Sequence, residues 1–167
     1  MLALFATSVV VFGAVHLTGD PIAQLAGGRP LTENQTDTLR QEIRSRCDTI
    51  EETYELMLGY AAQGLRDESG SSSAGQLRVF LSRTDAALGE IPTLFRSLAD
   101  ASAGDIAAKY HAFIAVLERD AQAASAALQL VLAQPRISSQ LIDNLNASIH
   151  LRALLTDVFL VDELLAE

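Results

Sequence analysis

The sequence contains no tryptophan, a single cysteine and few aromatic residues, which make up 5% of its 167 residues. One cysteine excludes an intrachain disulfide and a metal site built from several cysteines, so we expect Cys47 to be a buried thiol without a chemical role. With so few aromatic residues, a chain that is 49% hydrophobic and in which alanine and leucine are prominent is typical of packed helices rather than of strands. The composition therefore predicts an all-α fold.

Positive charge is also scarce. Lysine and arginine together number 12 against 21 aspartates and glutamates, which gives a net charge of -9. Binding to nucleic acid requires clustered basic side chains that contact the phosphates. The charge balance therefore predicts no nucleic-acid partner and favours basic or neutral partners.

The N-terminal segment, in contrast, is a long apolar run with no formally charged residue before Asp20. A helix that spans a bilayer needs about 20 mostly apolar residues, a length that is just reached if His16 and Thr18 lie at the interface. We predict that residues 2–18 anchor the protein in a membrane. The alternatives are a secretory signal peptide, which normally has a basic region at its start, and a helix buried against the rest of the protein.

A turn, a small-residue stretch and a helix start follow this run, in Thr18–Pro21, Leu25–Gly28, Thr32–Gln35 and Leu39–Arg40. Gly-Asp-Pro ends a helix, and Thr32 with Gln35 is the pattern of a capping box. Together these motifs, within residues 1–45, resemble the end of the first transmembrane helix and the next segment of dipeptide/oligopeptide ABC transporter permeases.

The permease resemblance implies that the residues after the span lie outside the cell, whereas the arginines between Arg29 and Arg46 favour the inside. The family has proline where this chain has Thr18, and no second hydrophobic span follows. Transport requires several spans around a path, so the chain alone cannot transport. It would be a truncated or fused relative.

Beyond Thr36, apolar residues recur at steps of four and three, the period of a helix with one buried face. The first stripe is Leu39, Ile43, Cys47, Ile50, Tyr54, Met57 and Ala61; the second is Leu77, Leu81, Leu88, Ile91, Phe95 and Leu98, with Thr84 in the missing slot; the third is Ile106, Tyr110, Phe113, Leu117, Ala121, Ala124, Leu128 and Val131. Loops at 64–75, 100–105 and 133–136 separate the helices, and the last helix is expected over 137–165. Pro92 should kink the second helix near Gly89 or restart it.

Four helices of similar length with short links predict an antiparallel four-helix bundle over residues 37–167. It is preceded by the hydrophobic helix of residues 1–18, an anchor or a buried helix, and by a linker over 19–36 that contains the Gly-Asp-Pro turn.

The last helix is apolar on more than one face, although a bundle helix needs only one apolar stripe. We expect its surplus to contact a second copy of the chain or another protein, through Leu155, Val158, Phe159, Leu160 and Val161. The alternative is that this helix is the most buried one of the bundle.

A di-metal site in a bundle commonly uses Glu-x-x-His pairs, but no glutamate lies three residues before His16, His111 or His150. We expect no metal and no cofactor. A weaker candidate set pairs His111 with Glu118 and His150 with Asp157, each seven residues apart and so on one helix face, with Glu52 or Glu55 as a further ligand.

Asn144 and Asn146 lie in a leucine-rich helix although asparagine disfavours helix interiors. They either fix the register between helices, form a polar binding patch, or are solvated.

No set of residues in the chain specifies a reaction. The sequence therefore predicts a non-enzymatic, acidic helical bundle that acts through protein contacts and is tied to a bacterial inner membrane, with a cytoplasmic location as the alternative. A component of a peptide ABC transporter is the second hypothesis, and a metal-binding bundle is the third.

Overall fold

The computed structural model describes residues 31–67, 74–101 and 105–166, which form helices without any strand. The helices are α3 (Glu33–Ala61), α4 (Ala74–Ala101), α5 (Asp105–Leu132), α6 (Ser139–Asn146) and α7 (Ile149–Ala166). The all-α prediction is confirmed. The predicted anchor, the Gly-Asp-Pro turn and most of the permease-like segment lie outside the described residues, among which no helix is both long and apolar enough to cross a bilayer.

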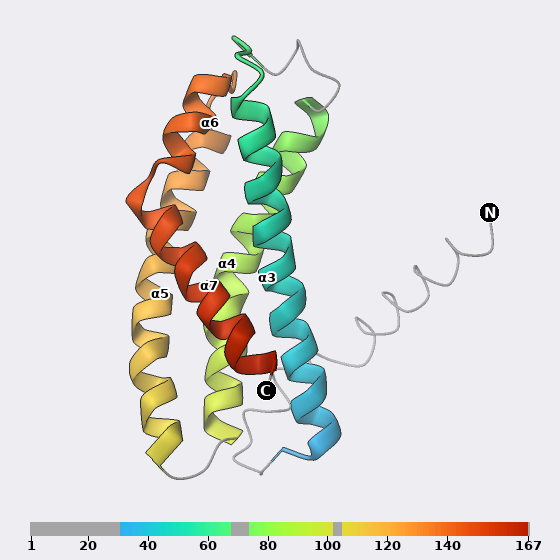
Figure 1. Ribbon diagram of the computed structural model, residues 1–167, viewed down its shortest axis with the longest axis vertical. Helices are drawn as coiled ribbons and strands as arrows, with labels where there is room; N and C mark the ends of the chain where they lie inside the picture. The colour runs from blue at the N-terminus through green and yellow to red at the C-terminus, as the bar shows by residue number, and fades with distance from the viewer. Residues whose placement is uncertain (1–30, 68–73, 102–104, 167) are drawn as a thin grey trace, which may run out of the picture.

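α3, α4 and α5 run alternately up and down the long axis of the molecule, and α6 and α7 both run back down it (Figure 1). α4 packs between α3 and α5, whereas α6 packs mainly on α3, and α7 packs on α5 and, to a lesser extent, on α3. Within the described residues the backbone of α4 comes close to neither α6 nor α7, so α4 lies across the molecule from them. α6 and α7 follow one another along the chain, and α7 runs obliquely from α5 toward α3.

α3 begins with the predicted capping box. The Thr32 hydroxyl accepts a hydrogen bond from the Gln35 backbone N–H at 3.3 Å, and the Gln35 side chain accepts one from the Thr32 N–H at 2.9 Å. Both donors would otherwise lack an intrahelical partner. The helix therefore begins at Glu33, inside the segment 19–36 that the sequence assigned to a linker.

The buried face of α3 follows the predicted stripe as far as Ile50 and again at Met57, but it differs by one residue at two other positions. Thr53 is buried in place of Tyr54, which is half-buried. The Thr53 hydroxyl donates to the Thr49 carbonyl at 2.8 Å and accepts from the Thr84 hydroxyl at 2.7 Å. A polar side chain whose hydrogen bonds are made can be buried at little cost, so these threonines pin the register of α3 against α4.

On α4 the predicted stripe is buried throughout, and the helix continues through Pro92 without restarting. Proline removes one helical hydrogen bond, but Ile91, Leu94 and Phe95 around it are all buried. Tertiary packing on both sides of Pro92 therefore maintains one continuous helix, whereas a restart at Pro92 was one of the two outcomes expected from the sequence.

The stripe on α5 begins later than predicted. Ile106 is exposed, Tyr110 and Phe113 are half-buried, and Ile114 is buried instead. From Leu117 to Val131 the predicted residues are all in the core.

The single helix predicted over 137–165 is wrong, because α6 ends at Asn146 and α7 starts at Ile149. Asn144 and Asn146 are poor helix formers at the end of α6. The Ala147 N–H still donates to the Asp143 carbonyl at 3.0 Å, while the Ser148 carbonyl already accepts from the first turn of α7. This break redirects the chain and gives α7 its oblique path (Figure 1).

Candidate functional site

Exposed large apolar side chains gather on α7. Ile149 is 75% exposed, Phe159 54%, Leu160 48% and Leu164 41%, and we call these four residues the α7 surface. Ile149, Leu160 and Leu164 are separated by eleven and four residues and so lie on one side of the helix, with Phe159 beside them. The other large exposed apolar residues among those described are Leu58, Val79, Ile106 and Leu130, which are distributed over α3, α4 and α5.

The structure corrects the predicted contact set on this helix. Leu155, Val158 and Val161 are buried in the core, because α7 packs on α5 and α3. Phe159 and Leu160 remain exposed, as a contact surface requires. The surface thus consists of two of the five predicted residues together with Ile149 and Leu164.

Two charged residues border the α7 surface. Arg152 and Glu163 are exposed and lie eleven residues apart, which places them on the same side of α7. Neither forms an ion pair with another described residue, in contrast to Arg96 and Glu118, which pair at 3.1 Å between α4 and α5. The border therefore offers one free charge of each sign.

Two carboxyl groups meet between α7 and α5, Asp157 on α7 and Asp120 on α5. Burial, and next the negative charge of Asp120, raise the pKa of Asp157 from 3.8 to about 6. The Oδ2 atom of Asp157 is buried and has no hydrogen-bond partner among the described residues.

Toward α3, the Asp162 carboxylate lies 3.9 Å from Arg44. Burial, and next Asp162, Asp48 and Glu55, raise the pKa of the neighbouring Glu51. Apolar packing thus holds α7 in place, although acidic side chains meet at its contacts with α5 and with α3.

We expect acid to stabilise the fold through Asp157. The folded-state pKa of about 6 exceeds the ordinary 3.8, so the folded protein binds a proton in this interval that the unfolded chain does not. Stability from this group is therefore complete below pH 4 and is lost as the pH rises through 6. Because the carboxyl is only partly buried and solvent screens part of the interaction, the gain between pH 8 and pH 5 should be only about 1 kcal/mol.

Urea unfolding at pH 8 and pH 5 measures this gain. Asp157→Asn should remove it, while Asp143→Asn, which changes an exposed aspartate on α6, should leave it unchanged. An equal pH dependence in the natural chain and the Asp157→Asn variant would contradict the role of Asp157.

The weak metal candidates are not brought together. His111 lies 3.2 Å from Asp100, Glu118 pairs with Arg96, and His150 is exposed in the first turn of α7. Glu52 and Glu55 are exposed on α3. No group of three or more histidine, cysteine or acidic side chains in the described part of the chain is placed to hold a metal ion.

Cys47 is buried, as predicted. Burial, and next the charge of Asp162, raise the pKa of its thiol to about 12. At neutral pH the group is a protonated thiol, which is a poor nucleophile.

The structure places Asn144 and Asn146 in different environments. Asn144 is exposed and accepts a hydrogen bond from the Gln140 side chain at 3.3 Å. Asn146 is only 7% exposed, and neither its amide oxygen nor its amide nitrogen has a hydrogen-bond partner among the described residues. They therefore form no common patch.

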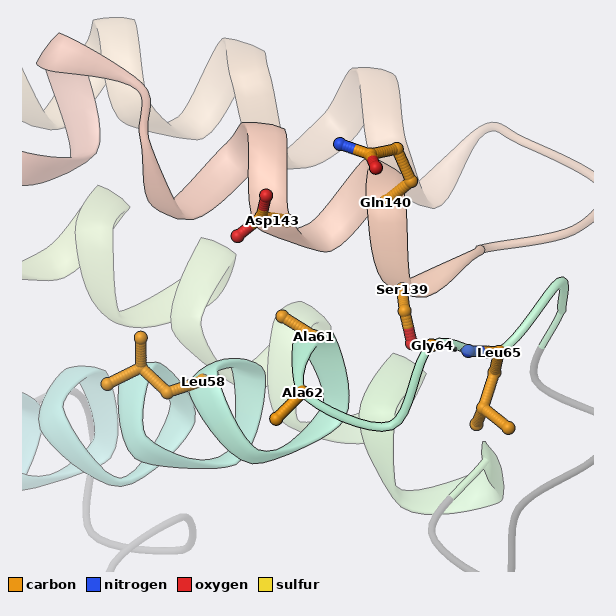
Figure 2. Close-up of a pocket in the computed structure, with 8 residues that line it drawn as sticks. All are labelled: Leu58, Ala61, Ala62, Gly64, Leu65, Ser139, Gln140 and Asp143. Carbon is orange, nitrogen blue, oxygen red and sulfur yellow. Dashed lines mark hydrogen bonds between the residues drawn. The ribbon is translucent and has the colours of Figure 1, made fainter.

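A cavity of about 450 Å³ lies at one end of the molecule, between the end of α3 and the start of α6 (Figure 2). The Ser139 hydroxyl in its wall donates to the Tyr60 carbonyl at 2.6 Å and accepts from the Leu65 N–H at 2.9 Å. The buried Tyr60 hydroxyl donates to the Ile137 carbonyl at 2.7 Å. These groups join the two helix ends, so the Ser139 hydroxyl has a structural role.

Sequence reasoning missed this contact. Tyr60 fell one residue outside the predicted stripe, which had Ala61 in its place, and Ser139 was assigned to a helix without a function. The available signal was the serine pair after Pro135, since the Ser138 side chain accepts a hydrogen bond from the Leu141 N–H at 3.1 Å and caps α6.

No protein-family model, curated protein or solved structure matches this chain. The relation of residues 1–45 to transporter permeases stays a prediction, and only the capping box and the first turns of α3 from that segment belong to the described residues.

Proposed function

We propose that this chain is an antiparallel four-helix bundle, with α6 and α7 as its fourth arm, that acts through protein contacts made by the α7 surface. The observation that supports this function is the gathering of Ile149, Phe159, Leu160 and Leu164 on one helix. Covering apolar area contributes about 25 cal/mol per Å², and contiguous exposed apolar patches on a soluble domain mark contact sites. The function in this proposal is non-enzymatic.

The apolar segment of residues 2–18 would hold the bundle at a bacterial inner membrane. All of the charges of the chain follow this segment and sum to -9. Anionic headgroups repel such a surface, so the anchor rather than the α7 surface would supply the attachment.

A photo-cross-linkable residue in place of Leu160 tests the contact in cells that express the full chain. We expect discrete heavier species after irradiation, because a partner covers this side chain. The matched control is the same replacement at Leu130, which is 67% exposed on α5 and should yield the monomer alone. Equal cross-linking at both positions, or none at Leu160, would contradict a contact through α7.

The second candidate function, a truncated or fused component of a peptide ABC transporter, is favoured by the capping box at Thr32 and Gln35, which lies where the permease-like motifs place a helix start. Genes for a peptide-binding protein and for transport ATPases beside the gene for this chain would support it. Their absence would count against it.

A further inference from the structure

We infer that the partner of the α7 surface is a second copy of this chain, bound through α7 in an antiparallel arrangement whose twofold axis passes beside Thr156. This inference rests on the proposed function and adds the identity of the partner and the geometry of the contact.

The exposed side of α7 is self-complementary in an antiparallel register. Ile149, Ala153, Thr156, Leu160 and Leu164 follow one another at steps of four, three, four and four residues and so form one strip along the helix. About a twofold axis, each residue meets the residue at the same distance on the other side of the axis. An axis between Thr156 and Asp157 brings Ile149 to the partner's Leu164 and Ala153 to the partner's Leu160. Two large side chains meet in the first pair, and the small Ala153 leaves room for the large leucine in the second.

The border charges obey nearly the same symmetry. The midpoint between Arg152 and Glu163 lies one residue further along α7, so Arg152 and the partner's Glu163 are displaced by two residues, about 3 Å along the helix, which a flexible arginine side chain spans. Arg152 of one copy therefore meets the partner's Glu163, and the pair occurs twice. Both side chains are exposed, and neither is paired with another described residue of its own chain.

Charge also selects the antiparallel direction. In a parallel pair of α7 helices, Arg152 would meet the partner's Arg152 and Glu163 the partner's Glu163, and such like-charge contacts disfavour the wrong arrangement. Phe159 lies beside the strip and less than one helical turn from the axis, so its aromatic ring would cover the centre of the contact.

Charge reversal in the full chain tests the pairing. Sedimentation in density-matched detergent at 0.15 M salt, where distant charges are screened, gives the dimer dissociation constant. Arg152→Glu and Glu163→Arg should each raise this constant by about tenfold or more, since each change replaces two attractive contacts by two repulsive ones. The double variant Arg152→Glu/Glu163→Arg restores both pairs with reversed polarity and should return to within about threefold of the natural chain.

Cysteine cross-linking tests the register independently of affinity. Thr156→Cys should form a disulfide with its own copy on oxidation, because it lies beside the axis, whereas Val79→Cys on the exposed side of α4 should not. Ile149→Cys should cross-link to Leu164→Cys in a mixture of the two variants and not to itself. The native Cys47 is buried and does not compete.

The outcomes separate the two proposals. A natural chain that is monomeric at all concentrations, a double variant as weak as the single ones, or self-cross-linking of Ile149→Cys would overturn the antiparallel homodimer. If Leu160 still gives specific photo-cross-links in that case, the protein-contact function stands with a different partner. Loss of that specificity overturns the proposed function itself.

Discussion

The Phe95→Ala variant should unfold with a free energy of unfolding about 3–5 kcal/mol below that of the natural chain. Phe95 is fully buried on α4, and its ring centroid lies 5.5 Å from that of Tyr110 and 6.3 Å from that of Phe113, both in edge-to-face geometry. Truncation removes the burial of the ring and two aromatic contacts that hold α5 against α4. Urea denaturation followed by circular dichroism measures the loss.

Val79→Ala is the matched control, since it shortens an exposed apolar side chain on the same helix and should change stability by less than about 0.5 kcal/mol. Phe95 also follows Pro92 by three residues, so its packing explains why α4 continues past the proline. Amide exchange in residues 93–101 should therefore accelerate more than in 75–88. A loss of stability below about 1 kcal/mol would mean that this aromatic cluster does not hold α4 to α5.

Periodicity predicted the core well where the buried residues are apolar. Leu39, Ile43, Cys47 and Ile50 identify the buried face of α3 by their spacing alone, and the structure buries all four. The prediction failed at Thr53 and Tyr60, whose burial depends on hydrogen-bond partners contributed by α4 and by the segment before α6. Partners distant in sequence cannot be read from a helical stripe.

The candidate site, too, could be predicted only as far as it depends on the sequence of one helix, and not where it depends on tertiary packing. Composition indicated that the last helix has more apolar surface than a bundle uses, but a helix that is apolar all round has no amphipathic direction. The break after Asn146 and the packing of α7 on α5 and α3 decide that Val158 faces inward and Leu160 outward. Likewise, His111 and Glu118 share a helix, but Asp100 and Arg96 on α4 determine their contacts.

Replacing Asn146 by Leu should raise the free energy of unfolding by about 1–3 kcal/mol, because a buried amide without hydrogen bonds is costly. Asn146 is the last residue of α6, and its Oδ1 and Nδ2 atoms have no partner among the described residues. Leucine is of similar length, has no polar atoms to desolvate and is a better helix former. Urea denaturation measures the gain, and Asn144→Leu at an exposed position of the same helix should change stability by no more than about 0.5 kcal/mol.

The same variant also tests whether the buried Asn146 is needed for the break between α6 and α7. If its poor helix propensity keeps α6 and α7 separate, Asn146→Leu should favour one continuous helix and rotate the α7 surface away from its partner, so that stability rises while photo-cross-linking at Leu160 falls. A gain in stability with unchanged cross-linking would show that the break is set by the packing of α7 over α5 and α3 instead. A loss of stability comparable to the expected gain would show that the Asn146 amide is hydrogen-bonded in the folded protein, and would contradict the prediction.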